Sequence, residues 1–231
     1  MSILECNGLV KRFGPTTALD GVSFAIEPGR IVGLLGPNGS GKTTLIKLAN
    51  GLLVPTEGQI WIDGHTPGKE SHAMVSYLPE RTSLPLWMTV KQLQDFYEDF
   101  YADFQRQRSS EMLDRLEISP KQRMKQMSKG TREKVQLVLT MSRQAKLYLL
   151  DEPIGGVDPA ARDYILDTII RNYNPEASVI ISTHLIADVE KILDEVLFID
   201  RGQILFQSAV DAIREEKGMS VDALFREVYK C

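Results

Sequence analysis

Short apolar runs recur along the chain and predict the strands of a sheet. Continuous runs, which are typical of buried strands, lie at 31–35, 147–150 and 178–182. Shorter or alternating runs predict further strands at 4–10, 22–26, 58–62, 73–78, 195–200 and 203–207. Asp63-Gly64 and Arg201-Gly202 each follow one of these strands, and each predicts a hairpin turn.

Apolar residues at helical spacing follow several of the predicted strands. One helix is expected from Thr44, after the first continuous run, and another after Ser128, which is a good N-cap residue. A third is expected after Pro159, through Arg171. The pattern from Val221 to Val228 predicts a short amphipathic helix near the end of the chain.

The segment from Leu84 to about Lys125 is helical in character and rich in aromatic residues. It holds six of the 17 aromatic residues of the chain: Trp87, Phe96, Tyr97, Phe100, Tyr101 and Phe104. The three phenylalanines are spaced by four residues, so they are expected to share one helix face. We expect most of these rings to form the core of a small helical insert, and any exposed remainder to be a docking surface.

Length and composition are those of an ordinary globular protein. The 231 residues fit one large domain, or one domain with an insertion, and 43% of them are hydrophobic. A net charge of −4 does not call for a nucleic-acid partner, and no apolar run approaches the ~20 residues of a membrane span. Residues 1–10 do not resemble a secretion signal, and Cys6 and Cys231 lack metal-ligand spacing, which fits a reducing cytosol.

The loop directly after the apolar run 31–35 has the composition of a phosphate-binding loop. Its residues are Gly36, Pro37, Asn38, Gly39, Ser40, Gly41, Lys42, Thr43 and Thr44. Glycines allow the backbone N–H groups to approach an anion, Lys42 supplies a positive charge for the β- and γ-phosphates, and the Thr43 hydroxyl can ligate Mg²⁺. The loop leads into a helix N-terminus, which favours bound phosphate, and this context distinguishes it from an ordinary glycine-rich turn.

Polar residues follow other predicted strands. Asp151 and Glu152 end a strand at its carboxyl end, where α/β sheets bind ligands, and His184 follows a second buried strand at the same edge. A single histidine is usually structural, and only these neighbours favour a role in the site. Phe13 is open to two interpretations, a core residue or a ring that stacks on adenine.

Six motifs in this order resemble those of the ATP-binding cassette family. They are the phosphate loop, Tyr77-Leu78-Pro79-Glu80, Met127-Ser128-Lys129-Gly130-Thr131, Leu150-Asp151-Glu152-Pro153, Gly156-Val157-Asp158 and Ser182-Thr183-His184. The likeness covers essentially the whole chain, and no Asn-Lys-x-Asp motif supports a GTPase. The resemblance implies one α/β domain over 1–231, with a P-loop NTPase core, an antiparallel β-subdomain, a helical insert at about 85–145 and a helical tail at about 208–231.

The resemblance also implies a role for each motif in ATP hydrolysis with Mg²⁺. Phe13 would stack on the adenine, where the family more often has Tyr, and the phosphate loop would hold the phosphates. Asp151 would hold Mg²⁺ through water, and Glu152 would be the general base for the attacking water. A carboxylate that only supports the site is the alternative for Glu152. His184 would hydrogen-bond the γ-phosphate, and Glu80 would sense Mg²⁺ and the water.

The length of the helix expected after Ser128 indicates how two copies of the chain would assemble. A helix over 129–145 would be about 25 Å long, and it would carry Ser128 away from Asp151 and Glu152. Ser128 and Gly130 are therefore expected to close on the nucleotide of a second, head-to-tail copy, which makes two shared sites. The expected partners are that second cassette subunit and a transmembrane permease at the inner face of the cell membrane, with no nucleic acid.

Two departures from the family pattern indicate which kind of cassette within the family this chain resembles. The usual Leu-Ser-Gly-Gly-Gln signature is here Met127-Ser128-Lys129-Gly130-Thr131, and the usual Gln is Glu80, which cannot donate a hydrogen bond as a carboxylate. These two changes, together with the segment 87–90, make the sequence similar to cassettes of exporters whose membrane subunit is a separate chain. A soluble cassette ATPase acting on ribosomes or DNA is the alternative, and a phosphotransferase would leave residues 127–131 unexplained.

Overall fold

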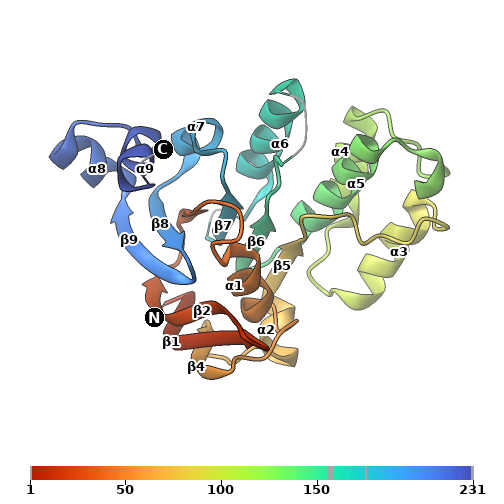
Figure 1. The fold of residues 1–231 in the computed structure, drawn as a ribbon. Coiled ribbons are helices and arrows are strands. Elements are labelled where there is room, and N and C mark those ends of the chain that lie inside the picture. The colour runs from red at the N-terminus through yellow and green to blue at the C-terminus, as the bar shows by residue number, and fades with distance from the viewer. Residues whose placement is uncertain (1, 156–158, 175, 230–231) are drawn as a thin grey trace.

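Two sheets organise the computed structural model, which describes residues 2–155, 159–174 and 176–229 (Figure 1). The smaller sheet is antiparallel, with the order β2-β1-β4. Its strands are β1 (Leu4–Phe13), β2 (Thr16–Ile26) and β4 (Glu57–Ile62). The larger sheet has the order β5-β6-β7-β3-β8-β9 and is parallel except for β9. Its strands are β3 (Ile31–Leu35), β5 (Val75–Leu78), β6 (Leu147–Asp151), β7 (Ser178–Thr183), β8 (Glu195–Asp200) and β9 (Gln203–Ala209).

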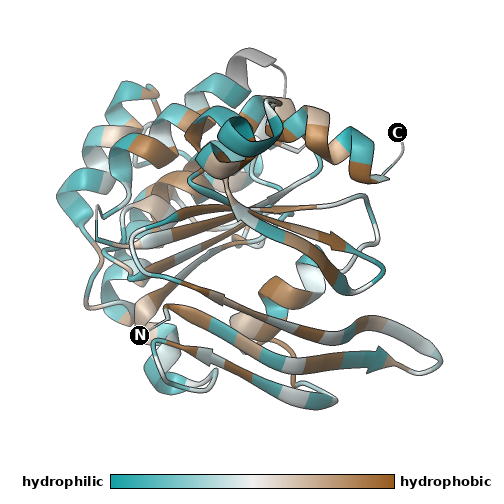
Figure 2. Ribbon diagram, turned by 90° about the vertical axis from the view of Figure 1, so that its left-hand side faces the viewer, coloured by the Kyte–Doolittle hydropathy of each residue, from teal (hydrophilic) through white to brown (hydrophobic). Residues whose placement is uncertain are grey.

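The larger sheet is buried on both faces, which explains its continuous apolar runs. Along β6, Leu147 and Leu149 pack with α1 (Lys42–Ala49) and the smaller sheet, whereas Tyr148 and Leu150 face the opposite cluster. Figure 2 shows these layers, with the larger sheet between helices on one side and the smaller sheet on the other. The covering helices are α6 (Pro159–Asn172), α7 (Ile186–Val189), η2 (Glu190–Ile192), α8 (Val210–Lys217) and α9 (Val221–Tyr229).

Helices between β5 and β6 lie to one side of the sheets, at the right of Figure 1. They are α3 (Val90–Phe100), α4 (Arg106–Arg115), η1 (Met124–Gln126) and α5 (Lys129–Met141). We refer to residues 90–141 as the helical insert. No helix in the described part of the chain is both long and apolar enough to cross a membrane.

The prediction of one phenylalanine face in the insert was wrong. Helix α3 ends at Phe100, and Phe104 lies beyond it, buried against Tyr97. The buried face of α3 is instead formed by Val90, Leu93 and Gln94, because tertiary packing selects it over the equally periodic aromatic set. Phe96 and Phe100 stack on each other with 43% and 68% of their surface exposed.

Other element boundaries also differ from the predictions. The expected strand at 73–78 begins only at Val75, because residues 69–74 form helix α2 (Lys69–Met74), closed at its start by Ser71. The chain turns at Asp63-Gly64 as expected, but the residues after the turn form only the single bridge between Ile62 and His65 in the described structure, and β4 pairs with β1 instead. Helix α5 ends at Met141 instead of residue 145, and two helices, α8 and α9, follow β9.

Candidate functional site

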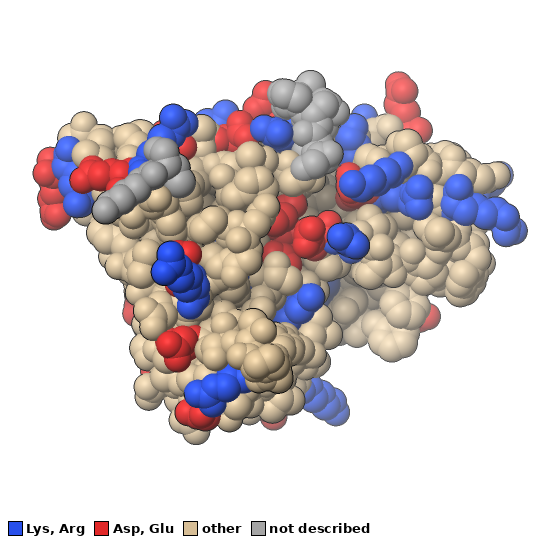
Figure 3. Space-filling view, viewed as in Figure 1, with Lys and Arg blue, Asp and Glu red and all other residues tan. Residues whose placement is uncertain are grey.

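A cavity of about 840 Å³ lies at the carboxyl ends of β3, β6 and β7, between the sheets and the helical insert. It is lined by Ala18, Asn38, Gly39, Gly41, Lys42, Thr43, Thr44, Glu80, Arg81, Thr82, Lys129, Arg132, Glu133, Glu152, Gly155 and His184. Figure 3 shows acidic side chains gathered in a hollow at the centre of this face, with basic side chains around it. The volume is within the range of small-molecule sites.

The loop after β3 leads into a helix, as predicted, but α1 begins at Lys42, two residues before the expected Thr44, so the loop spans Gly36 to Gly41. Gly41 caps the helix with φ of 113°, a backbone conformation that favours glycine. The Lys42 ammonium donates to the carbonyl oxygens of Gly36 at 2.8 Å and Pro37 at 3.1 Å, so the lysine folds back along its own loop. This arrangement places a lysine and a helix N-terminus at one wall of the cavity.

Asp151 provides an oxygen that fits a divalent cation. Its Oδ1 accepts hydrogen bonds from Thr43 Oγ1 at 3.0 Å and Ser182 Oγ at 2.7 Å. Its Oδ2 is buried and has no hydrogen-bond partner in the described part of the chain. Burial raises the pKa of Asp151, and the nearby charges of Glu80 and Glu152 raise it further. A bound Mg²⁺ would offset the unfavourable burial of the charged carboxylate, since Mg²⁺ prefers oxygen ligands.

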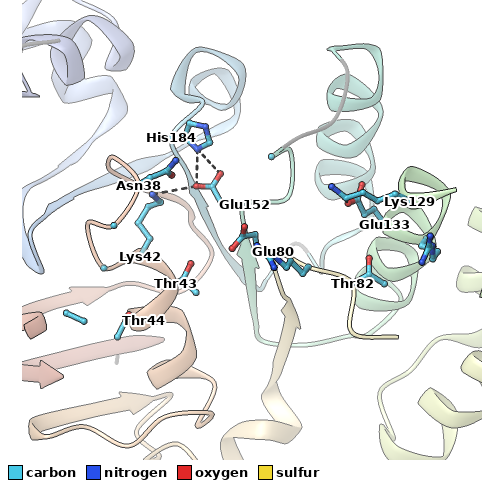
Figure 4. Close-up of a pocket in the computed structure, with 16 residues that line it drawn as sticks. Asn38, Lys42, Thr43, Thr44, Glu80, Thr82, Lys129, Glu133, Glu152 and His184 are labelled. Atoms are coloured by element: carbon cyan, nitrogen blue, oxygen red, sulfur yellow. Dashed lines mark hydrogen bonds and ion pairs between the residues drawn. The ribbon is translucent and has the colours of Figure 1, made fainter. Parts of the chain in front are cut away.

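Glu152 lies at the centre of the polar groups in the cavity (Figure 4). Its carboxylate is 3.1 and 3.2 Å from Nδ1 of His184, accepts a hydrogen bond from Thr183 Oγ1 at 3.1 Å, and lies 3.5 Å from Lys42 Nζ. Its backbone has φ of 49°, and its N–H donates to Ser182 O. Burial lowers the pKa of Lys42, and Glu152 opposes that shift. The residue directly after β6 therefore faces the phosphate-loop lysine.

Glu80 extends from the end of β5 toward the same cavity (Figure 4). Its charge, with that of Asp151, adds to the effect of burial, which raises the pKa of Tyr77 to about 12. The carboxylates at positions 80, 151 and 152 come from two neighbouring strands, and the charges of Glu80 and Glu152 act on Asp151. No three His, Cys, Asp or Glu side chains of the described residues are grouped closely enough to hold a metal ion by themselves, so a cation here would also need ligands from the nucleotide or water.

Other predicted site residues do not line this cavity. Phe13 ends β1 and is 46% exposed, with Lys11 Nζ 5.0 Å from the centre of its ring. Ser128 caps α5 by accepting the N–H of Thr131 at 3.1 Å, as its position predicted. Neither Ser128 nor Gly130 lines the cavity of its own chain, and a Cβ at Gly130 would meet no atom of the described residues within 4 Å. Gly36, Pro37, Ser40 and Asp151 do not line the cavity either, but Gly36 and Pro37 accept hydrogen bonds from Lys42, and Asp151 accepts one from Thr43.

Several cavity residues were not predicted. Arg81 and Thr82 directly follow Glu80, and helical spacing places Lys129, Arg132 and Glu133 on one face of α5. Figure 4 labels Thr82, Lys129 and Glu133 at the cavity. These residues could have been found from the sequence, because they lie within or directly beside the motifs and helical spacing places positions 129, 132 and 133 together. Ala18 of β2 carried no chemical signal in the sequence, since only the packing of the smaller sheet brings it to the cavity.

Comparison with known protein families gives a match to the model described as "ABC transporter", over residues 19–155. The chain is 30% identical to the ABC-type transporter ATP-binding protein EcsA of Bacillus subtilis, over all of this chain and 98% of the relative. It is 28% identical to the daunorubicin resistance ATP-binding protein DrrA3 of Streptomyces coeruleorubidus, over 97% and 74% of the two chains. The Nod factor export ATP-binding protein I of Ralstonia nicotianae is 32% identical, over 89% and 66%.

Solved structures give the same fold. One described as the ATP binding subunit of an ABC transporter superposes with a TM-score of 0.88 at 28% identity, over 99% of this chain and all of that one. A dimeric ATP-binding cassette, MJ0796, solved in a post-hydrolysis state with ADP and Pi, superposes with a TM-score of 0.77 over 89% and 98%. At 20% identity, this second structure supports the fold alone.

Proposed function

Given that this chain belongs to the ABC transporter family as an ATP-binding and ATP-hydrolysing subunit, we propose that it acts with Mg²⁺ as a head-to-tail dimer driving a separate membrane permease. The observation that supports this most directly is the convergence of Lys42, Glu152, His184 and the Thr43–Asp151 pair at one cavity. Nucleotide binding, cation binding and proton transfer each have a suitable group there.

In this proposal each polar group has one task in hydrolysis. Lys42 and the loop N–H groups bind the β- and γ-phosphates, and His184 hydrogen-bonds the γ-phosphate. Glu152 orients the attacking water and accepts its proton at a carboxylate oxygen. Thr43 and Asp151, the latter through water, would hold Mg²⁺, which supplies positive charge to the phosphates. Glu80 extends toward the same cation, and Phe13 would stack on the adenine.

The second copy is proposed because one chain does not close the site by itself. Lys129 lies across the cavity from the phosphate loop, on the insert, and Ser128 and Gly130 do not line the cavity (Figure 4). Helix α5, with 13 residues, is about 20 Å long and begins at these residues. In a head-to-tail dimer, Ser128, Gly130 and the helix dipole of one copy would contact the γ-phosphate bound by the other.

The proposed permease contact is on the helical insert and the segment before it. Leu86, Trp87, Phe96 and Phe100 expose between 43% and 68% of their surface. Large exposed apolar side chains favour contact with another protein. The names of two relatives, concerned with daunorubicin resistance and Nod factor export, support export as the direction of transport. The chain would then act at the inner face of the cell membrane.

Affinity purification of the tagged chain from solubilised membranes tests this proposal. We expect recovery of a membrane-spanning protein together with the chain. Phe100→Glu is expected to lose that partner and keep ATP hydrolysis, because it places a charge on the proposed contact. Val54→Glu is the matched control, since Val54 is 76% exposed and lies outside the insert. Recovery of ribosomes or nucleic acid without any membrane protein would contradict the transporter role.

A further inference from the structure

The turn between β8 and β9 packs against both the phosphate loop and β2. The N–H of Gly202 donates to the carbonyl oxygen of Ser40 at 2.9 Å, and the carbonyl of Gly202 accepts from the N–H of Asp20 at 2.9 Å. The side chain of Gln203 donates to the Asp20 carboxylate at 3.1 Å. One residue of this turn therefore joins the phosphate loop to β2 through its backbone.

The approach of Gly202 to β2 leaves no room for a side chain. A Cβ at this position would lie 2.7 Å from Ala18 O and 2.8 Å from the Cα of Leu19, both of which are backbone atoms. The residue also has φ of 77°, which favours glycine. Any substitution must therefore move the turn, the strand or both.

The end of β8 supports the first residue of the phosphate loop in the same way. A Cβ at Gly36 would lie 2.2 Å from Ile199 O, so backbone meets backbone there as well. The Ile199 carbonyl also accepts a hydrogen bond from the Tyr229 hydroxyl at 3.0 Å, which fixes it from α9. The β8–β9 hairpin thus contacts the phosphate loop near both of its ends.

The hydrogen bond from Gly202 also fixes the direction of the N–H group of the next residue, Gly41, which lines the cavity. A peptide unit is planar and trans, so the Ser40 C=O and the Gly41 N–H point in opposite directions. With the Ser40 carbonyl held by Gly202, the Gly41 N–H is directed away from the hairpin, and Gly41 lines the cavity. Phosphate loops bind anions through such N–H groups.

We propose that Gly202 is a positioning residue for ATP binding, which it supports by holding the Ser40 peptide through its N–H. The proposal rests on nucleotide binding at the phosphate loop. It assigns a role to a turn that lies 162 positions after Ser40 in the sequence and outside the six motifs. The hairpin acts through the loop and does not contact the phosphates itself.

Gly202→Ala in the full chain tests the proposal, with Gly29→Ala as the matched control. Gly29 has φ of 73°, and a Cβ there would lie more than 4 Å from every atom in the part of the chain that the structure describes. Its substitution therefore has a similar backbone conformational cost without the steric contact. We expect the Kd for ADP and the KM for ATP to rise on the order of tenfold to a hundredfold in Gly202→Ala. The kcat should stay close to that of Gly29→Ala, whose nucleotide affinity should be normal. The unfolding midpoint of Gly202→Ala should be lower than that of Gly29→Ala, because the turn or the strand must move.

Equal nucleotide affinity in the two variants would overturn the proposal. If Gly202→Ala does not fold, amide hydrogen exchange of the wild-type chain decides the question. ADP should slow exchange of the Gly202 N–H much more than that of Gly29, and equal effects would again overturn the proposal. Failure of the wild-type chain to bind ADP would instead contradict the nucleotide site itself.

Discussion

At the scale of single residues, Glu152 shows how much chemistry the fold concentrates at one position. It has a left-handed backbone conformation, which is costly for a residue with a side chain. Three groups, from Lys42, Thr183 and His184, contact its carboxylate, and its side chain is only 11% exposed. A strained residue surrounded by such partners is typical of a functional site.

Glu152→Gln is expected to bind ATP and to lose turnover on the order of a thousandfold, because the amide cannot accept the proton of the attacking water. The variant should also accumulate as an ATP-bound dimer. Phosphate release and light scattering measure the two effects. Glu133→Gln is the control, since Glu133 lines the same cavity without contacting Lys42 or His184 among the described interactions. Full hydrolysis by Glu152→Gln would remove this residue from the role of general base.

Cys6 gives a second prediction at the residue scale. Its side chain is buried in β1, and burial raises the pKa of the thiol far above its usual range. The reactive form is the thiolate, so the folded chain should resist alkylation by iodoacetamide at pH 8. Mass spectrometry of the peptide containing Cys6 should show modification only after unfolding in urea. Rapid modification of the folded chain would show that this end of β1 opens.

At the scale of elements, Arg143 connects the helical insert to the sheet. It follows α5, and its guanidinium donates to the Asp103 carboxylate and to the carbonyl oxygens of Ala73 in α2 and Val75 at the start of β5. The Cζ atom of Arg143 also lies 3.9 Å from the ring centre of Tyr101. The side chain is only 3% exposed, so this network is buried between the insert and the sheet.

Arg143→Met should lower the free energy of unfolding by roughly 3 kcal/mol, because it leaves a partly buried carboxylate and two carbonyl oxygens without their donor. Urea denaturation measures this change. Arg106→Met is the control, since Arg106 also pairs with two carboxylates of the insert but is 32% exposed. Its loss should cost less than about 1 kcal/mol. Equal costs would mean that burial of Arg143 does not determine its contribution.

At the scale of the whole molecule, the separation of the phosphate loop from Ser128 bears on assembly. The first is connected to β3 and the second caps a helix of the insert, with the cavity between these parts (Figure 4). A dimer of the proposed kind would bring each Ser128 to the other copy's nucleotide. ATP binding would then favour association, and hydrolysis would favour release.

Ser128→Arg is expected to prevent ATP-driven dimerisation, because the larger charged side chain would occupy the space of the partner's phosphate. Nucleotide binding by the monomer should persist. Thr89→Arg is the matched control: Thr89 caps α3 of the same insert, so both variants lose a helix cap worth about 1 kcal/mol. Light scattering with and without ATP compares them. Normal dimerisation of Ser128→Arg would contradict the shared site.

The sequence by itself determined the features that consecutive residues control. The phosphate loop, the cap at Ser128 and the two carboxylates at the end of β6 were predicted because backbone conformation and residue chemistry act over a few neighbouring positions. Only the tertiary structure decided which aromatic rings of the insert are buried, which groups surround Glu152, and that Gly202 meets Ser40. These contacts join residues far apart in the sequence, so they depend on how strands and helices pack, and no local pattern encodes them.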